Sequence, residues 1–195
     1  MNTQEFTLTS QGLGMNEALD ATEKLGKEGG LSEKNLMQLR LLAEELFGML
    51  KSITGNQEAA YHAEQEGGTY RLVLNADVHM TQDVRENLLS VASSGTNEAA
   101  KGFMGSLKEM IAKALLPDDT QPSMLSLGVM SMGSPGGLRT GTGSYDWSLK
   151  KFRSEAEEHD EVWDKLEKSI VASIADDVTV SIEGQSVRIT IVKAF

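Results

Sequence analysis

The stretch AAYHAEQEGGTYRLVLNAD, residues 59–77, decides the fold because it predicts a β-hairpin near the middle of the chain. Gly67 and Gly68 favour a tight turn, since glycine tolerates the positive φ angles that such turns need. After the turn, polar and apolar positions alternate, as they do in a strand with one buried face. The apolar face consists of Tyr70, Leu72 and Leu74. This pattern predicts an antiparallel pair that is covered on one side.

The end of the chain also predicts a β-hairpin. DVTVSIE and SVRITIVKAF are both alternating segments, and Glu183-Gly184-Gln185 lies between them as a turn. Their expected buried positions are Val178, Val180, Ile182, Val187, Ile189 and Ile191. EFTLTS, near the start of the chain, predicts one more short strand.

Two helices are expected between the first strand and the hairpin. The first begins near Asn16 and stops at GKEGG, where paired glycines form a helix C-cap. The second starts after Ser32, a favourable N-cap, and is expected to run to Gly55. Its middle carries adjacent acids, Glu44 and Glu45, which either form a solvated surface or face a pocket.

Further helices are expected after the hairpin, one capped by Thr81 and one from about residue 98 to 116. Gly102 and Gly105 lie in the second of these, and each glycine costs roughly 1 kcal/mol against alanine in a helix interior. Such a cost suggests close approach to a ligand, and tight helix packing is the alternative. Leu107 and Ile111 belong to its expected buried stripe.

All three prolines lie in residues 117–144, among many glycines and serines, which predicts a long mobile loop. YDWSLKKF then predicts an edge strand. Residues 157–174 predict a helix that places Ile170 and Ile174 on its buried face.

This order of elements predicts an α+β fold, a two-layer sandwich with a mostly antiparallel sheet and helices packed on one face. We expect a single domain over residues 1–195, with the long loop at about 117–144 and without internal repeats.

Composition excludes several classes of function. The net charge of −11 disfavours binding to nucleic acid or to anionic membrane surfaces. The chain has no cysteine and therefore no disulfide or thiolate metal site. It contains neither an N-terminal signal peptide pattern nor an apolar run of roughly 20 residues, so we expect a cytoplasmic protein.

Four segments together resemble the GHKL family, the ATP-binding fold of histidine kinases and gyrase. They are LRLLAEEL, YRLVLNADVHM, SSGTNEAAKGFMGSLKEMI and VRITIVKAF. The branch they resemble most is that of the small anti-sigma-factor serine kinases. The resemblance covers roughly residues 1–115 and 176–195, and its motifs are degenerate.

The resemblance implies a nucleotide site for ATP or ADP. Glu45 matches the catalytic acid, and Asp77 matches the acid that reads adenine. Lys101, Gly102 and Gly105 match the side that receives the phosphates.

Two positions depart from the family pattern. The Mg²⁺-binding asparagine expected one turn after Glu45 is Met49, whose thioether is a poor ligand for this hard cation. The glycine expected two residues after Asp77 is His79, which would crowd the turn. No metal ligand is therefore assigned, and ATPase or kinase activity is expected to be very weak or absent.

Three functions follow. The first is a regulatory protein with a histidine-kinase-like fold, degenerate in Mg-ATP binding, that acts by binding a protein partner. The second is an active anti-sigma-type serine kinase. The third is an unrelated α+β enzyme whose small-molecule pocket is closed by residues 117–144. A homodimer is left open in each case.

Overall fold

The computed structural model shows helices and strands in the residues that it describes. It describes residues 1–50, 57–79, 81, 82, 84, 86, 107, 111, 115, 137–139, 144–156 and 170–195. The elements are β1 (Phe6–Thr9), α1 (Met15–Glu28), α2 (Glu33–Gly48), β2 (Glu58–Glu66), β3 (Thr69–Asp77), β4 (Gly137–Arg139), β5 (Ser144–Ser148), α6 (Leu149–Ala156), α8 (Ile170–Ile174), β6 (Asp177–Glu183) and β7 (Ser186–Ala194).

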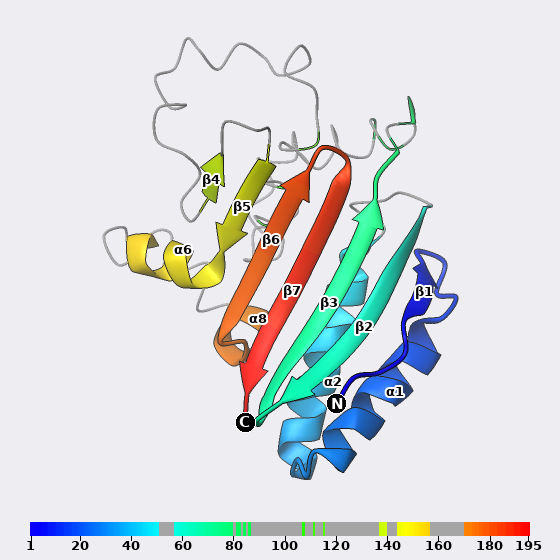
Figure 1. The fold of residues 1–195 in the computed structure, drawn as a ribbon, viewed down its shortest axis with the longest axis vertical. Coiled ribbons are helices and arrows are strands. Elements are labelled where there is room, and N and C mark those ends of the chain that lie inside the picture. The colour runs from blue at the N-terminus through cyan, green and yellow to red at the C-terminus, as the bar shows by residue number, and fades with distance from the viewer. Residues whose placement is uncertain are drawn as a thin grey trace.

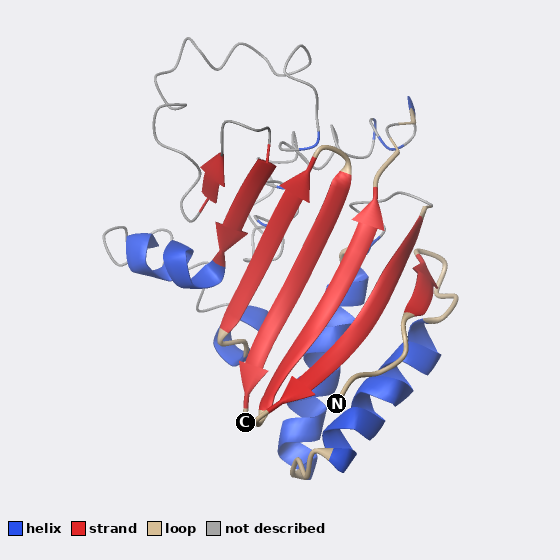
Figure 2. Cartoon of the chain, in the orientation of Figure 1, coloured by secondary structure: helices blue, strands red, loops and turns tan. Residues whose placement is uncertain are grey.

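The described strands form one seven-stranded sheet in the order β1-β2-β3-β7-β6-β5-β4 (Figure 2). Every neighbouring pair is antiparallel. The predicted α+β class with a mostly antiparallel sheet is therefore confirmed. Because β3 pairs with β7, the hairpin in the middle of the chain lies directly beside the hairpin at its end.

Both predicted hairpin turns are present. Gly67 and Gly68 have φ angles of 55° and 82°, and they join a pair in which Glu66 lies opposite Thr69. Gly184 has a φ angle of 61° in the turn between β6 and β7. These left-handed conformations are strained for a residue with a Cβ atom, which explains glycine at each position.

The sheet has two unlike faces. Helices α1, α2 and α8 lie behind it in Figure 1 and cover one side, which we call the helix face. Its strand residues are buried and in register across the sheet, namely Leu8, Tyr61, Leu72, Leu74, Val178, Val180, Val187, Ile189 and Ile191. The other side, the open face, is not covered by any described helix.

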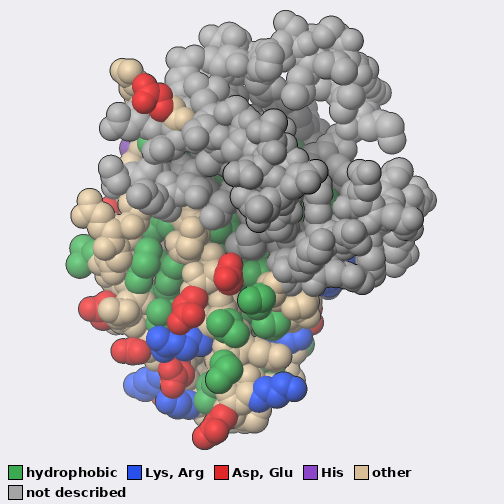
Figure 3. All heavy atoms as spheres, turned by 180° about the vertical axis from the view of Figure 1, so that it is seen from behind, with side chains coloured by type: hydrophobic (Ala, Val, Ile, Leu, Met, Phe, Trp, Pro, Cys, Tyr) green, Lys and Arg blue, Asp and Glu red, His purple; other side chains and the backbone are tan. Residues whose placement is uncertain are grey.

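Helix α6 packs beside β5, where Phe152 lies against Trp147 with ring centroids 5.8 Å apart. Trp147 is opposite Val180 and shares the helix face. Seen from behind, charged side chains are interspersed with hydrophobic ones on the solvent side of the helix layer (Figure 3). Met37 of α2 is among the exposed hydrophobic residues, at 66%.

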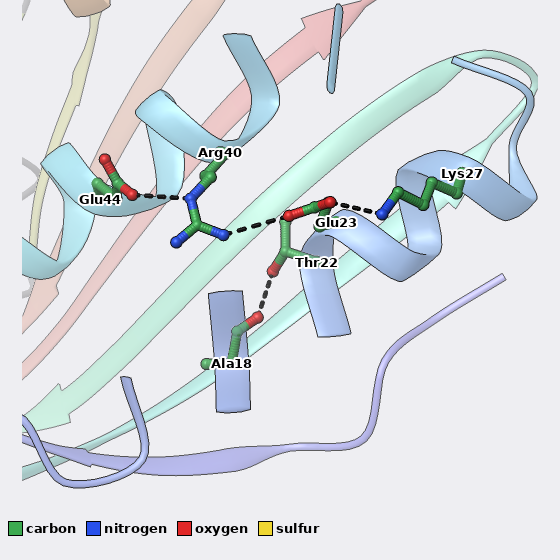
Figure 4. A network of polar contacts seen from close by, with 6 residues as sticks. All are labelled: Ala18, Thr22, Glu23, Lys27, Arg40 and Glu44. Carbon is green, nitrogen blue, oxygen red and sulfur yellow. Dashed lines mark hydrogen bonds and ion pairs between the residues drawn. The ribbon is translucent and has the colours of Figure 1, made fainter. Parts of the chain in front are cut away.

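Local signals position the two long helices. Ser32 caps α2 by accepting a hydrogen bond from the Asn35 N–H, at 3.4 Å. Arg40 of α2 donates to Glu44 one turn later and to Glu23 on α1, at 3.0 and 3.2 Å (Figure 4). Lys27 also contacts Glu23, at 2.6 Å. This network ties α1 to α2 on their solvent side, and such exposed pairs contribute little individually.

Several element boundaries differ from the sequence-based expectation. Helix α2 ends at Gly48, not at Gly55, and residues 51–56 lie outside the described part. Strand β4 lies within residues 117–144, which we expected to form a loop. Ser144, at the end of that range, begins β5. The remaining residues of the range lie outside the described part of the chain. YDWSLKKF is a strand followed by a helix, and its strand is not at the edge because β5 pairs with both β4 and β6.

The predicted buried face of the helix near residue 170 is only partly right: Ile174 packs against the core, but Ile170 does not. Ile170 is 53% exposed, whereas Val171, Ala172 and Ala175 are buried. Apolar side chains follow one another too closely here for periodicity to choose the face, and packing beside α2 decides it. By contrast, the Thr81 cap is confirmed, since its hydroxyl accepts a hydrogen bond from the Val84 N–H at 3.3 Å.

Candidate functional site

The two acids in the middle of α2 have different surroundings. Glu44 is exposed and accepts the hydrogen bond from Arg40, so it belongs to the solvated surface. Glu45 is partly exposed, at the flank of the buried stripe. One turn later, Met49 is 1% exposed and belongs to the hydrophobic core. The position that would hold a Mg²⁺ ligand in the family resemblance is thus filled by a core side chain.

Asp77 ends β3 and is exposed, whereas its neighbours Ala76 and Val78 are 5% and 0% exposed. Because side chains alternate along a strand, the carboxylate of Asp77 lies on the open face. Glu45 is on a helix that covers the opposite face. The structure therefore separates the two acids that the resemblance places at one nucleotide. The other three predicted site residues, Lys101, Gly102 and Gly105, lie outside the described part of the chain.

The chain that follows β3 is held in place by a pair of hydrogen bonds. The side-chain amide of Gln57 donates to the carbonyl oxygen of His79 at 2.7 Å and accepts from its N–H at 2.8 Å. The imidazole of His79 remains exposed. The histidine at this position therefore does not prevent an ordered turn, because a side chain from the start of β2 satisfies its backbone.

An open hollow of about 580 Å³ lies on the open face, at the end of the sheet where Asp77 is found. Its walls come from β1, β2, β3, β7 and the residues that flank them. The polar lining residues include Thr7, Gln57, Asn75, Asp77, His79 and Arg188. Its volume is in the range of small-molecule sites.

Three charged side chains of the described residues line this hollow, namely Glu58, Asp77 and Arg188, and the last two lie on neighbouring strands. The Nε of Arg188 donates to the Oδ1 of Asn75 at 2.8 Å, across the pairing of β3 with β7. Among the described residues, the carboxylate of Asp77 has no hydrogen-bond or ion-pair partner. An oriented guanidinium and an unpaired carboxylate therefore lie next to each other on adjacent strands, and they could bind a ligand that carries both charges.

Sequence reasoning found Asp77 but missed Arg188 and Asn75. Alternation alone places both on the polar side of their strands. The signal that was lacking is the register, since these residues are 113 positions apart in the chain. Their contact depends on which strands are neighbours.

Within the described ranges, no group of three or more His, Asp or Glu side chains could hold a metal ion. None of the helices that the structure describes is long and apolar enough to cross a membrane. Comparison with known proteins finds no matching family model, no matching curated protein and no matching solved structure.

Proposed function

We propose that this chain is a cytoplasmic regulatory protein with a scaffold of the GHKL type, which acts by binding a protein partner and not by transferring phosphate. The reason for proposing this scaffold is the resemblance of the sequence motifs. The α+β architecture, with helices on one face of an antiparallel sheet, is compatible with it. A fold alone does not specify function, so the argument rests on the site residues.

The burial of Met49 supports this proposal most directly. Phosphoryl transfer needs a metal ion that neutralises the charge developing on the phosphate oxygens. At the position where that ion would be held, the side chain is apolar and belongs to the core. Glu45 therefore has no metal-binding residue one helical turn later.

The separation of Glu45 from Asp77 supports it further. A nucleotide held as in the family would have to be reached by both acids. Asp77 is on the open face, and α2 covers the other face. The described residues thus offer no single pocket in which the two acids meet.

Calorimetric titration with ATP and ADP, with and without Mg²⁺, tests whether Mg²⁺ strengthens nucleotide binding. Phosphate release from ATP tests turnover. We expect no affinity gain from Mg²⁺ and no release of phosphate over hours. Steady ATP turnover by the native protein that is abolished in Glu45→Ala would overturn the proposal and favour a serine kinase. Glu44→Ala is the matched control, because it removes an acid that binds Arg40 on the surface.

Partner binding needs its own experiment. Proteins retained by the immobilised chain would be identified by mass spectrometry, purified, and mixed again with the chain in sedimentation velocity runs. A stoichiometric complex of the two purified proteins is the expected result. Sedimentation of the chain alone at several concentrations detects a homodimer. If no retained protein forms a complex after purification, the partner-binding proposal is wrong.

A further inference from the structure

The hollow beside Asp77 carries an inference that goes beyond the binding of a protein partner. Its chemistry is set by Arg188 and Asp77, and neither is needed for the packing of the core, since both side chains are exposed. Long charged side chains on an open sheet face are usually either solvated or paired with each other. Here each has a feature that points to a ligand.

Arg188 is oriented before any ligand arrives. Its Nε donates to the Asn75 amide oxygen at 2.8 Å, which directs the guanidinium along the open face. The two terminal nitrogens are left with their N–H donors, and none of these has a partner among the described residues. A fork of this kind matches the two oxygens of a carboxylate.

Asp77 supplies the opposite charge one row further along the sheet. Asn75 pairs with Arg188 and Asp77 pairs with Ser186, so Asp77 and Arg188 are diagonal neighbours on β3 and β7. Diagonal neighbours have Cα atoms roughly 7–8 Å apart, within reach of an ion pair between long side chains. No such pair forms, because Arg188 turns toward Asn75. The carboxylate is left as a free acceptor at the edge of the hollow.

The wall of the hollow is also fixed. Gln57 holds the backbone of His79 through two hydrogen bonds, so the chain after β3 keeps its position beside Asp77. A site whose polar groups are held by a second layer of hydrogen bonds loses less entropy when a ligand binds.

We propose that this hollow binds a small zwitterion of the α-amino acid type. The ligand's carboxylate lies on the terminal nitrogens of Arg188, and its ammonium group lies on the carboxylate of Asp77. A ligand with several negative charges is disfavoured, since Asp77 and Glu58 both line the hollow. A simple cation is the weaker match because it would leave the terminal N–H donors of Arg188 without an acceptor.

The test uses the full chain and the twenty free L-amino acids, each titrated alone by calorimetry up to about 10 mM, which covers dissociation constants near 1 mM. We expect at least one to bind. Its N-acetyl derivative lacks the ammonium group and its amide lacks the carboxylate, so both should bind at least about tenfold more weakly. Equal binding of either blocked form would overturn the proposal and point to a single-charge ligand or a peptide end.

Variants locate the site. Arg188→Gln and Asp77→Asn should each weaken binding roughly tenfold or more. Arg71→Gln is the matched control, because it changes a partly exposed charge near the other end of β3 on the same face and should leave binding unchanged. Circular dichroism checks that each variant is folded.

The proposal fails if none of the twenty amino acids binds. It also fails if one binds but neither Arg188→Gln nor Asp77→Asn weakens it. This result is independent of the proposed function, because neither ATP turnover nor the partner experiment depends on the hollow.

Discussion

The phenol oxygen of Tyr61 lies 2.7 Å from the Oγ1 of Thr22, in the buried layer between β2 and α1. The same Thr22 hydroxyl donates its only hydrogen to the carbonyl oxygen of Ala18, also at 2.7 Å. The proton between the two side chains must therefore come from Tyr61. Burial raises the pKa of Tyr61, and the hydrogen bond with Thr22 lowers it by less, so this donor stays protonated at ordinary pH.

Because Tyr61 is the donor and Thr22 the acceptor, removing one or the other is expected to lower the free energy of unfolding by different amounts. Thr22→Val leaves a buried donor on Tyr61 without an acceptor, and we expect a loss of about 1–3 kcal/mol in the free energy of unfolding. Tyr61→Phe leaves only an extra lone pair on Thr22 and should cost about 1 kcal/mol. Urea unfolding of both single variants and the double variant measures the asymmetry. Equal costs would mean that the proton is shared differently.

The carboxylate of Asp176 predicts a pH dependence of stability. Partial burial opposes its ionisation, but the Ala194 N–H at 2.6 Å and the Lys193 ammonium at 3.0 Å outweigh burial and hold the pKa below its ordinary 3.8. The ionised form therefore stabilises the fold above the unfolded-state pKa, and this contribution disappears as the pH falls through the lower folded-state pKa.

We expect Asp176→Asn to be less stable than the native chain at pH 7, with the difference shrinking as the pH is lowered below about 4. Thermal unfolding at pH values from 3 to 7 measures it. The matched control is Glu183→Gln, whose exposed carboxylate is at the far end of β6. A gap between native and Asp176→Asn that stays constant over this range would contradict the assignment of the stabilising partners.

Gly29 and Gly48 predict opposite effects of alanine. A Cβ at Gly29 would overlap the hydroxyl of Tyr70, a buried side chain, so Gly29→Ala should cost about 1–3 kcal/mol. A Cβ at Gly48 meets nothing within 4 Å at the end of α2, so Gly48→Ala should stabilise by about 0.5–1 kcal/mol. Chemical denaturation compares the two.

Tyr70 provides the test of that mechanism. Its hydroxyl is buried and has no hydrogen-bond partner among the described residues, so Tyr70→Phe alone should change stability little. In the double variant Gly29→Ala/Tyr70→Phe, the overlapping oxygen is absent and most of the lost stability should return. If the double variant is as unstable as Gly29→Ala, the cost comes from the helix end and not from Tyr70.

The sequence predicts the fold class well because the strongest signals are local. The turn at Gly67 and Gly68 and the cap at Ser32 depend on a few adjacent residues, and the structure has both where expected. Ile170 was wrongly placed on the buried face of α8, since that face depends on packing against α2, which is distant in sequence. For the same reason Arg188 was missed as the neighbour of Asn75.

The predicted site was less accessible to sequence reasoning. A motif match assigns Glu45 and Asp77 to one ligand, but the side of the sheet on which each lies depends on strand parity relative to the helix layer. Alternation around Asp77 already places it with Asn75 and away from Leu74. Asp77 is therefore expected on the face of the strand opposite to the apolar face that the helices cover. This expectation already separates it from Glu45, which lies on one of those helices.

The burial of Met49 changes what an asparagine at this position would do. From sequence alone, Met49→Asn is the substitution that would restore a Mg²⁺ ligand beside Glu45. In the structure, Met49 is 1% exposed within the core, so an amide there loses apolar contacts and is buried without an assigned partner. We therefore expect Met49→Asn to lower the free energy of unfolding by about 2–5 kcal/mol and to confer no Mg²⁺-dependent nucleotide binding.

Met37→Asn is the matched control, because Met37 is 66% exposed on the same helix and its replacement should change stability by less than about 0.5 kcal/mol. Denaturant unfolding of both variants, followed by ATP titration of Met49→Asn with and without Mg²⁺, gives the comparison. A Met49→Asn protein that is as stable as Met37→Asn would show that this side chain turns out of the core at little cost. If it also bound ATP only with Mg²⁺, Glu45 would border a working nucleotide site, and the kinase alternative would replace partner binding.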